Sequence, residues 1–386
     1  MKLGIVLSGG GSKGAYQMGV WKALRRLHIK YDIVTGTSVG ALNAALMTQK
    51  TYYKGLSLWK NLTFEDVVDE EIEADITTRK GKNTILKTYA KGFRNGGISI
   101  TNLEKTLDKI LDIKKIYHSK IDMGIVTVKS KNLSPLLLTK RQIEPKNLRN
   151  YLIASASCFP AFKKKNINDV EYIDGGFFDN LPINLAIDMG AQEIIAVDLK
   201  EVGIKRKVKN KNIKITTISP RNDTGSFLIF DSDLSKRAIQ LGYNDTMKTF
   251  HHLDGINYTF KKNHLHKNYL KYKDVFEKRY ELKIKEEEFN QIIENLGYIF
   301  QLDDSKIYSI NHYNHLLKNK FLKVKSDLTI SNLIEENKIR QLFSSQIVLK
   351  YIYEILDKDD ERLEKAIKLF SNEYKETLYL KCMLEV

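Results

Sequence analysis

The feature that most restricts the fold of this chain is the segment Gly36-Thr37-Ser38-Val39-Gly40, which lies between two apolar runs. The run before it, "YDIVTGT", predicts a short buried strand, and the run after it, "VGALNAALM", predicts a helix buried nearly all round. Glycine favours neither element, so two glycines around one hydroxyl indicate a sharp turn with a close crossing of strand and helix. In that context G-x-S-x-G predicts a nucleophile elbow with Ser38 as candidate nucleophile. On this segment alone, a small-residue turn with an idle serine remains an alternative.

The first 48 residues alternate between strand and helix patterns. "LGIVLS" (3–8) predicts a buried strand, and "GAYQMGVWKALRRLHI" (14–29) places apolar side chains at helical spacing. Two strand–helix pairs in succession predict a layered α/β fold. Further strands are predicted at 121–130, 134–140, 171–174, 192–199 and 213–220, and further helices at 148–157 and 232–252.

A run of three glycines separates the first predicted strand from the first helix, in "SGGGSKG" (8–14). Unshielded backbone N–H groups before a helix start form an anion-binding nest. The spacing of Gly9, Gly11 and Gly14 fits the dinucleotide pattern G-x-G-x-x-G, but Asp32 lies before the next strand rather than at its end, which weakens that interpretation. The P-loop string is absent. The remaining interpretation is an oxyanion hole, which holds a transient alkoxide.

A third glycine-marked segment is "YIDGGFFDNLP" (172–182), in which Asp174 ends a predicted strand and Gly175 and Gly176 follow. An ordinary Asp-Gly turn is the simplest interpretation of this segment by itself. Together, the three segments supply a nucleophile, a candidate base and an anion nest, which are the parts that acyl transfer requires.

The base of this arrangement is predicted to be an aspartate. Most serine hydrolases use histidine, and the order Ser38, Asp174, His251 fits the order of serine, acid and histidine in α/β-hydrolases. Only one or two strands precede Ser38, however, and no histidine has a glycine-framed setting. We therefore favour a dyad in which Asp174 accepts the Ser38 proton directly, from a partly desolvated site. The chain has eight histidines: His28, His118, His251, His252, His264, His266, His312 and His315.

The segments "LSGGGSKGAYQMGV", "GTSVGALNAAL" and "DGGFFDNLPI", in this order, resemble the patatin-like phospholipase family, and most closely its bacterial branch with G-G-G-x-[KR]-G. The resemblance covers roughly residues 3–250. It implies a three-layer α/β/α sandwich, no metal or cofactor, Ser38 as nucleophile and Asp174 as proton acceptor. By the same resemblance Gly9, Gly10 and Gly11 line the oxyanion hole. The positions that match the motif framework are Gly14, Gly36, Gly40, Gly175, Gly176, Asn180 and Pro182, and Lys13 matches a basic position without a derivable role.

The expected function is that of a lipid acyl hydrolase, a phospholipase A or lysophospholipase-like esterase that releases fatty acids. Two other functions are kept open by the sequence. One is a non-catalytic adaptor that binds lipid or a partner through the region after residue 260. The other is a nucleotide-binding module built on the first glycine segment. The sequence does not name the lipid class, the glycerol position or an activating ligand.

Charge and hydropathy bear on partners and location. The chain has 63 basic and 47 acidic residues, a net charge of +16, without a basic tail of the kind that grips nucleic acid. The densest basic segment, 79–94, has six basic residues and no acid, and is expected to be either a solvated loop or a face that attracts phospholipid head groups. No apolar stretch is long enough to span a membrane, the start is too short for a signal peptide, and Cys158 and Cys382 are far apart. These features predict a cytoplasmic protein, with peripheral binding at the inner membrane face as a further possibility.

The expected organisation is a catalytic domain at 1–255 and a mainly helical region of unknown role at 256–386. After residue 260 charged helical patterns dominate, and one of them carries an apolar stripe. That stripe is expected to pack on the rest of the protein or to bind a membrane or partner. Its members are Ile339, Leu342, Phe343, Ile347, Tyr351 and Ile355. The oligomeric state is not readable from the sequence.

Overall fold

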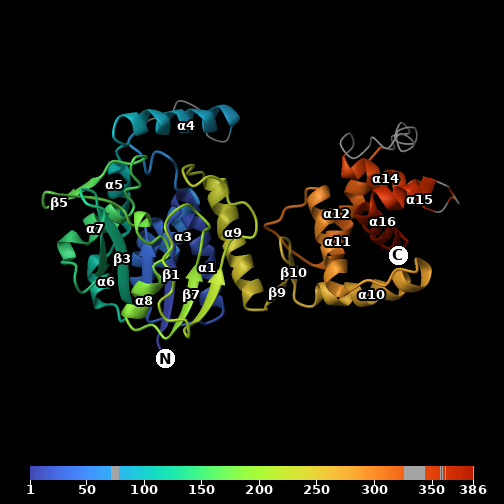
Figure 1. Ribbon diagram of the computed structural model, residues 1–386, viewed down its shortest axis with the longest axis horizontal. Coiled ribbons are helices and arrows are strands. Elements are labelled where there is room, and N and C mark those ends of the chain that lie inside the picture. The colour runs from blue at the N-terminus through green and yellow to red at the C-terminus, as the bar shows by residue number, and fades with distance from the viewer. Residues whose placement is uncertain (71–77, 326–343, 357, 359, 361, 386) are drawn as a thin grey trace. The chain divides into compact units, whose positions relative to one another are not determined.

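The structure, a computed structural model, describes residues 1–70, 78–325, 344–356, 358, 360 and 362–385 (Figure 1). The chain divides into two compact units, Met1–Thr249 and Phe250–Val386. Each unit has elements and a hydrophobic core of its own, and the two are described separately below.

The first unit is built around a mixed eight-stranded sheet with the order β5-β6-β3-β2-β1-β7-β8, in which β4 pairs with β3 outside this path. Its strands are β1 (Leu3–Leu7), β2 (Ile33–Thr37), β3 (Asp122–Lys129), β4 (Ser134–Thr139), β5 (Lys165–Ile167), β6 (Val170–Asp174), β7 (Glu193–Val197) and β8 (Lys214–Ile218). β1 pairs in parallel with both β2 and β7, and its apolar side chains are buried, as expected for a strand covered on both faces.

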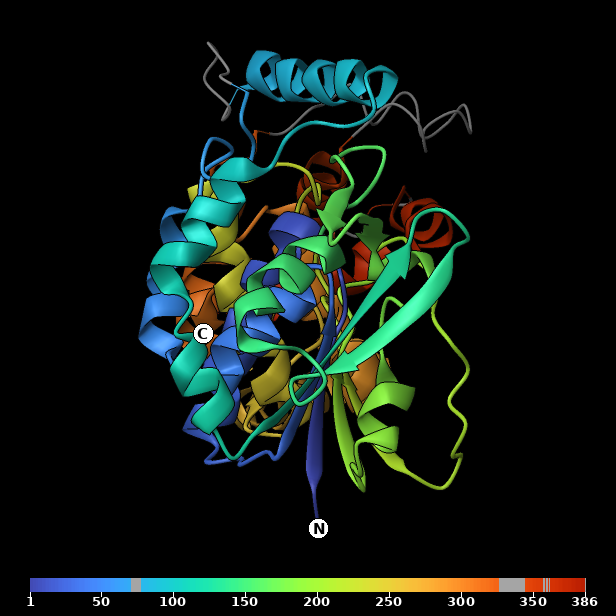
Figure 2. The same cartoon turned by 90° about the vertical axis from the view of Figure 1, so that its left-hand side faces the viewer.

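Helices cover both faces of this sheet. The helices are α1 (Gly14–Arg26), α2 (Val39–Thr48), α3 (Tyr52–Asn61), α4 (Arg79–Arg94), α5 (Thr101–Ile110), α6 (Ile113–His118), α7 (Leu148–Ser155), α8 (Ile183–Asp188) and α9 (Ser232–Thr249). Figure 2 shows the blue and yellow helices α1, α2 and α9 on one side of the strands and the light green α8 on the other. The unit is therefore a three-layer α/β/α sandwich, as predicted.

One edge of β3 carries two strands in succession, and this arrangement places the candidate site. β4 pairs with residues 124–129 along one edge of β3. β2 pairs with residues 122–126 and β6 with residues 127–129, so both lie along the other edge. β2 runs parallel to β3 and β6 runs antiparallel to it, so the carboxyl ends of β2 and β6 face each other. The residues that follow those two ends meet at one point of the sheet.

The basic segment 79–94 is the helix α4, so the expectation of a solvated loop there was wrong. Its buried residues Gly81, Ile85, Tyr89 and Gly92 recur at intervals of three and four, which is the spacing of one helix face. In the views of Figures 1 and 2, α4 lies beyond the carboxyl ends of the parallel strands.

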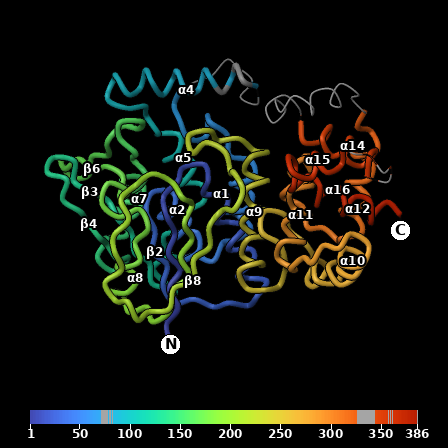
Figure 3. Tube along the Cα trace, turned by 45° about the vertical axis from the view of Figure 1, so that its right-hand side comes forward, coloured from blue at the N-terminus to red at the C-terminus, as the bar shows by residue number. Residues whose placement is uncertain are grey.

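The second unit consists mainly of helices, with a small three-stranded sheet of β9 (Leu253–Asp254), β10 (Thr259–Lys261) and β11 (Ile307–Tyr308). Its helices are α10 (His264–Arg279), α11 (Glu286–Ile299), α12 (Ile310–Phe321), α14 (Ser345–Ile355), α15 (Arg362–Leu369) and α16 (Ser371–Leu384), which gather in the orange and red part of Figure 3. The core is rich in aromatic residues, with Phe289 packed edge to face against Tyr269, Phe276 and Tyr379.

Part of the predicted apolar stripe lies on α14. Tyr351 and Ile355 are buried there, and Ile347 packs beside them, in a cluster with residues of α15 and the start of α16. This portion therefore packs inside its own unit. Ile339, Leu342 and Phe343 lie outside the described residues. Within the described parts of the chain, none of the helices has both the length and the apolar character needed to cross a bilayer.

Candidate active site

Ser38 lies at a strained turn between β2 and α2. Its backbone angles, φ 57° and ψ −130°, are unusual for a residue with a side chain. A Cβ at Gly36 would lie 2.2 Å from the Gly40 carbonyl oxygen, and one at Gly40 would lie 2.3 Å from the Leu7 carbonyl oxygen. Both glycines are therefore required by the close crossing of strand and helix. Ser38 is also the N-cap of α2, so it sits at the positive end of that helix dipole.

The sheet register brings Asp174 to Ser38. Thr37 pairs with Val126 on β3, and Asp174 pairs with the next residue, Thr127. The two strand ends thus meet, and the Ser38 hydroxyl lies close enough to the Asp174 carboxylate to lower the pKa of that carboxyl. A Cβ at Gly175 would lie 2.2 Å from the Val126 carbonyl oxygen, so the turn after Asp174 also needs glycine.

The Asp174 carboxylate is buried, with 5% of the residue exposed. Burial raises the pKa of this group from its ordinary value of 3.8 to about 6, and the hydrogen bonds from Ser38 and from the Gly176 N–H oppose that rise. The Gly176 nitrogen lies 2.7 Å from Asp174 Oδ1. A carboxylate in this setting is a stronger base than one in water and is still ionised at neutral pH.

Two buried serines that the sequence analysis did not single out hold this geometry. Ser155 Oγ accepts a hydrogen bond from the Ser38 N–H (2.9 Å) and donates one to the Val126 carbonyl (2.7 Å). The Ser157 carbonyl accepts the Asp174 N–H at 2.9 Å. Both serines come from "ASAS" at the end of α7. The only signal for these serines in the sequence is a run of small residues, and such a run does not predict what their hydroxyl groups contact.

The three consecutive glycines have different surroundings. The Gly9 N–H donates to the Asn180 carbonyl at 3.1 Å, so this group is already occupied. No hydrogen bond from the N–H of Gly10 or Gly11 is found among the described residues. Gly11 has φ 53°, and a Cβ there would lie 2.0 Å from the Phe227 carbonyl oxygen. The short 3-10 helix at Gly11–Lys13 and then α1 follow directly.

Four further motif positions differ in their surroundings. Lys13 forms an ion pair with Glu201, which ties the glycine loop to the segment after β7. A Cβ at Gly14 would lie 2.4 Å from Val39 Cγ2, which explains the glycine at the start of α1. Asn180 is buried, and its side-chain amide nitrogen has no hydrogen-bond partner within the described part of the chain. Pro182 precedes α8, and its carbonyl accepts a hydrogen bond from Thr35 Oγ1.

A cavity of about 500 Å³ opens beside Ser38 and Asp174. Its wall includes Gly9, Gly10 and Gly11, and most of the remaining lining is apolar. The apolar residues include Leu42, Leu46, Leu58, Trp59, Leu62, Leu103, Leu107, Ile110, Phe162 and Phe227. Such a cavity fits an acyl chain with its ester group at the hydroxyl.

The other candidates from the sequence lie elsewhere. His251 belongs to the second unit, and the first unit's His28 and His118 are exposed and do not line the cavity. Asp32 accepts a hydrogen bond from the Leu3 N–H at the amino ends of the strands, so it gives no support to a dinucleotide site.

The described residues contain no group of three or more histidines, cysteines or acids arranged to hold a metal ion. Cys158 lines the cavity, and burial raises the pKa of its thiol to about 12.

Comparison with known proteins agrees with the motifs. Residues 5–187, just under half of the chain, match the family described as Patatin-like phospholipase. The chain is 27% identical over 204 residues to Patatin-like phospholipase domain-containing protein 7 of Rattus norvegicus, covering 51% of this chain and 13% of that protein. It is 27% identical over 215 residues to Neuropathy target esterase sws of Drosophila melanogaster, covering 51% of this chain and 13% of that protein.

A third relative is Lysophospholipase NTE1 of Mycosarcoma maydis, which is 23% identical over 210 residues, covering 52% of this chain and 10% of that protein. The chain thus spans only a small part of the length of these relatives. Among solved structures, VipD from Legionella pneumophila aligns with 99% of this chain and 88% of that chain, with a TM-score of 0.40 and 14% identity.

Proposed function

Residues 5–187 are a patatin-like phospholipase domain, and from this premise we propose that the protein is a lipid acyl hydrolase that uses Ser38 and Asp174 as its catalytic dyad. The observation that carries the proposal is the meeting of the ends of β2 and β6, which places a strained serine against a buried carboxylate at the wall of an apolar cavity. A nucleophile, its base and an anion nest in one place are the parts of an acyl-transfer site.

The reaction begins with the acyl chain of an ester in the cavity and its carbonyl carbon at Ser38 Oγ. Asp174 accepts the hydroxyl proton as Oγ attacks and forms a tetrahedral oxyanion. When the intermediate collapses, the alcohol leaves with the proton from Asp174, and the acyl group remains on Ser38. Water then attacks the acyl-serine, gives its proton to Asp174, and releases the fatty acid as that proton returns to Ser38 Oγ.

The oxyanion is stabilised by the backbone of the glycine loop. In this proposal the N–H groups of Gly10 and Gly11 are the donors, because no hydrogen bond from either is found among the described residues. Gly9 serves by leaving space, because its N–H is occupied and a Cβ there would lie 3.0 Å from Ser38 Cβ. Loss of one such donor costs roughly a hundredfold to a thousandfold in kcat in other enzymes.

The cavity lining supports a proposal for the substrate class. An apolar cavity of about 500 Å³ favours a long acyl chain over a small polar ester. We therefore propose a phospholipid or lysophospholipid as substrate, met at a membrane surface. Four of the relatives found by comparison are named as lysophospholipases or as an esterase, which supports the ester class for this chain.

The test is fatty-acid release from mixed phospholipid vesicles, measured by mass spectrometry. We expect release by the intact protein and none above background by Ser38→Ala or Asp174→Asn, with both variants folded by circular dichroism. His251→Ala is the control and should keep full activity, because His251 does not line the cavity. Activity that survives in Asp174→Asn but is lost in His251→Ala would disprove the dyad. Vesicle binding without turnover in the intact protein would instead support an adaptor.

A further inference from the structure

We propose that the outer face of α4, together with the apolar rim of the cavity, docks the first unit onto an anionic phospholipid bilayer. We call this the docking surface, and it consists of Leu86, Lys87, Lys91, Phe93 and Arg94 on α4 and of Phe177, Val202 and Ile204 at the rim. The inference deepens the proposed function, because it names the surface through which a lipid substrate would reach Ser38.

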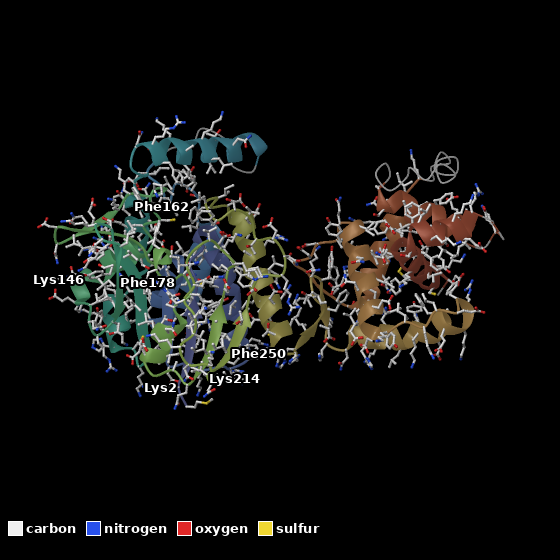
Figure 4. The ribbon with its side chains drawn as sticks, viewed as in Figure 1. Lys2, Lys146, Phe162, Phe178, Lys214 and Phe250 are labelled. Atoms are coloured by element: carbon white, nitrogen blue, oxygen red, sulfur yellow. The ribbon has the colours of Figure 1, made fainter. Side chains whose placement is uncertain are left out.

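The inner face of α4 is attached to the wall of the cavity. Tyr89 is 2% exposed, its ring packs edge to face against Phe64 and Phe162, and its hydroxyl donates to the Leu228 carbonyl at 3.2 Å. Phe162 and Leu228 both line the cavity. Figure 4 shows Phe162 close beneath α4 and Lys2 at the opposite end of the same unit. The helix therefore lies beside the cavity, at the end of the unit opposite Lys2.

The opposite face of α4 is basic. Lys87, Lys91 and Arg94 are exposed and recur at intervals of four and three residues, so they lie on one face of the helix. The described residues contain no ion partner for any of the three. The whole helix has six basic residues and no acidic one. A positive face without acids is complementary to anionic head groups, and each basic residue near such a surface favours binding.

Apolar side chains flank this basic face. Leu86 and Phe93 lie seven residues apart on one line of the helix, and they are 50% and 47% exposed. A helix whose exposed surface combines lysines and arginine with leucine and phenylalanine is typical of segments that lie in a membrane interface. The long lysine side chains can keep their charges at the head groups while Leu86 and Phe93 enter the acyl boundary.

The rim of the cavity has the same character. Val202 is 93% exposed, Ile204 is 50% exposed and Phe177 is 44% exposed, although all three line the cavity. The Ile204 N–H donates to the Gly176 carbonyl, so the loop that carries this rim is held against the turn after Asp174. Apolar side chains exposed around the mouth of an apolar cavity favour contact with a lipid surface over contact with water.

The docking surface is tested with vesicle co-sedimentation in the Ser38→Ala background, so that the lipid stays intact. The vesicles are phosphatidylcholine alone, or phosphatidylcholine with about one third phosphatidylglycerol. We expect binding to the anionic vesicles, and the double variant Lys87→Gln, Lys91→Gln should bind them roughly 10- to 30-fold more weakly. Leu86→Ser with Phe93→Ser should weaken binding to both kinds of vesicle.

The matched control is the double variant Lys2→Gln, Lys30→Gln, which removes the same charge at the amino ends of the strands. Lys2 and Lys30 are exposed, as are the changed residues of α4. The control should bind like the parent protein. Equal loss in the control and in the α4 variant would show a diffuse attraction by the net charge, and would overturn the docking surface. Unchanged binding by the α4 variants would overturn it as well.

A parallel measurement separates this inference from the proposed function. This measurement uses proteins in which Ser38 is unchanged. The Lys87 and Lys91 substitutions should leave the hydrolysis of a water-soluble short-chain ester unchanged. They should reduce the hydrolysis of anionic vesicles in proportion to the loss of vesicle binding. Specific vesicle binding without any hydrolysis would sustain the docking surface and reject the hydrolase. Hydrolysis of the soluble ester with no vesicle binding would sustain the hydrolase and reject the docking surface.

Discussion

At the scale of single residues, the turns at Ser38 and Asp174 are shaped by local steric needs, whereas the surroundings of the two side chains come from distant parts of the chain. The glycine patterns around Ser38 and Asp174 reflect steric needs of their own turns, which are local and therefore visible in the sequence. The burial that raises the pKa of Asp174, and the hydrogen bond that Ser155 Oγ accepts from the Ser38 N–H, depend on strands and helices distant in the chain. The Gly9 N–H likewise donates to the carbonyl of Asn180, which is distant in the chain. The sequence therefore could not show that the N–H of Gly9 is occupied.

The raised pKa of Asp174 predicts the pH dependence of hydrolysis. The base must be ionised, so kcat/KM for a soluble ester should rise with pH and level off above a pKa of about 6. The same shift lowers the free energy of unfolding as pH increases from about 4 to 6, because the Asp174 carboxyl holds its proton more tightly in the folded state than in the unfolded state. The measurement is a pH–rate profile from pH 4.5 to about 8.

Asp179 is the control for that profile. Burial raises the pKa of its carboxyl to about 6 as well, and its carbonyl accepts a hydrogen bond from Thr37 Oγ1. Asp179→Asn should keep the rise near pH 6 if Asp174 is the base. Loss of the rise in that variant would assign the titration to Asp179 instead.

At the scale of elements, the regular strands and helices near the site followed from their patterns. Strands with continuous apolar runs, such as β1 and β7, and the buried helix α2 lie where the sequence predicted them. The helix α4 was missed because its many lysines suggested a loop, whereas four small or apolar residues at helical spacing attach it to the unit. The end-to-end meeting of β2 and β6 could not be predicted, because strand register depends on pairing partners far apart in the chain.

Ser155, the last residue of α7, supports the turn that carries Ser38, and its substitution tests that support. Ser155→Ala removes the acceptor of the Ser38 N–H and leaves that half-buried group unsatisfied, so the turn loses its support. We expect kcat for a soluble ester to fall roughly 10- to 100-fold with little change in KM.

The neighbouring Ser157→Ala is the matched control for this substitution. Ser157 lies just beyond α7, and its Oγ donates to the Ile153 carbonyl in the last turn of that helix. Its contact with Asp174 uses the backbone carbonyl and is therefore retained. This variant should keep kcat within about twofold. A similar loss in both variants would mean that the end of α7 is merely destabilised.

At the scale of the whole molecule, the sequence indicated a change of character near residue 260, and the structure shows two compact units that divide at Thr249 and Phe250. The helical character of the second unit could be predicted from the sequence, because its charged and apolar residues alternate with the period of a helix. The aromatic core of the second unit was not readable, because it assembles residues from α10, α11 and α16.

Separate cores predict separate stabilities. Phe289 is fully buried in the second unit, and Phe289→Ala should cost that unit about 3–5 kcal/mol. Calorimetry should show the transition of the second unit at lower temperature and the other transition unchanged, with soluble-ester hydrolysis at 25 °C retained. Tyr298→Ala, at a residue of α11 that is 81% exposed, is the control and should leave both transitions in place. A single transition that shifts as a whole would contradict independent cores.

The meeting of β2 and β6 also has a consequence for synthesis. Residue 38 leaves the ribosome long before residue 174, and the intervening chain must add β3 before the ends of β2 and β6 can face each other. Non-local pairings of this kind form late in folding. A nascent chain therefore carries the proposed nucleophile without the proposed base, and we expect no hydrolysis by this dyad until the first unit has been completed. Recovery of activity after dilution from denaturant should accordingly be among the last events of refolding.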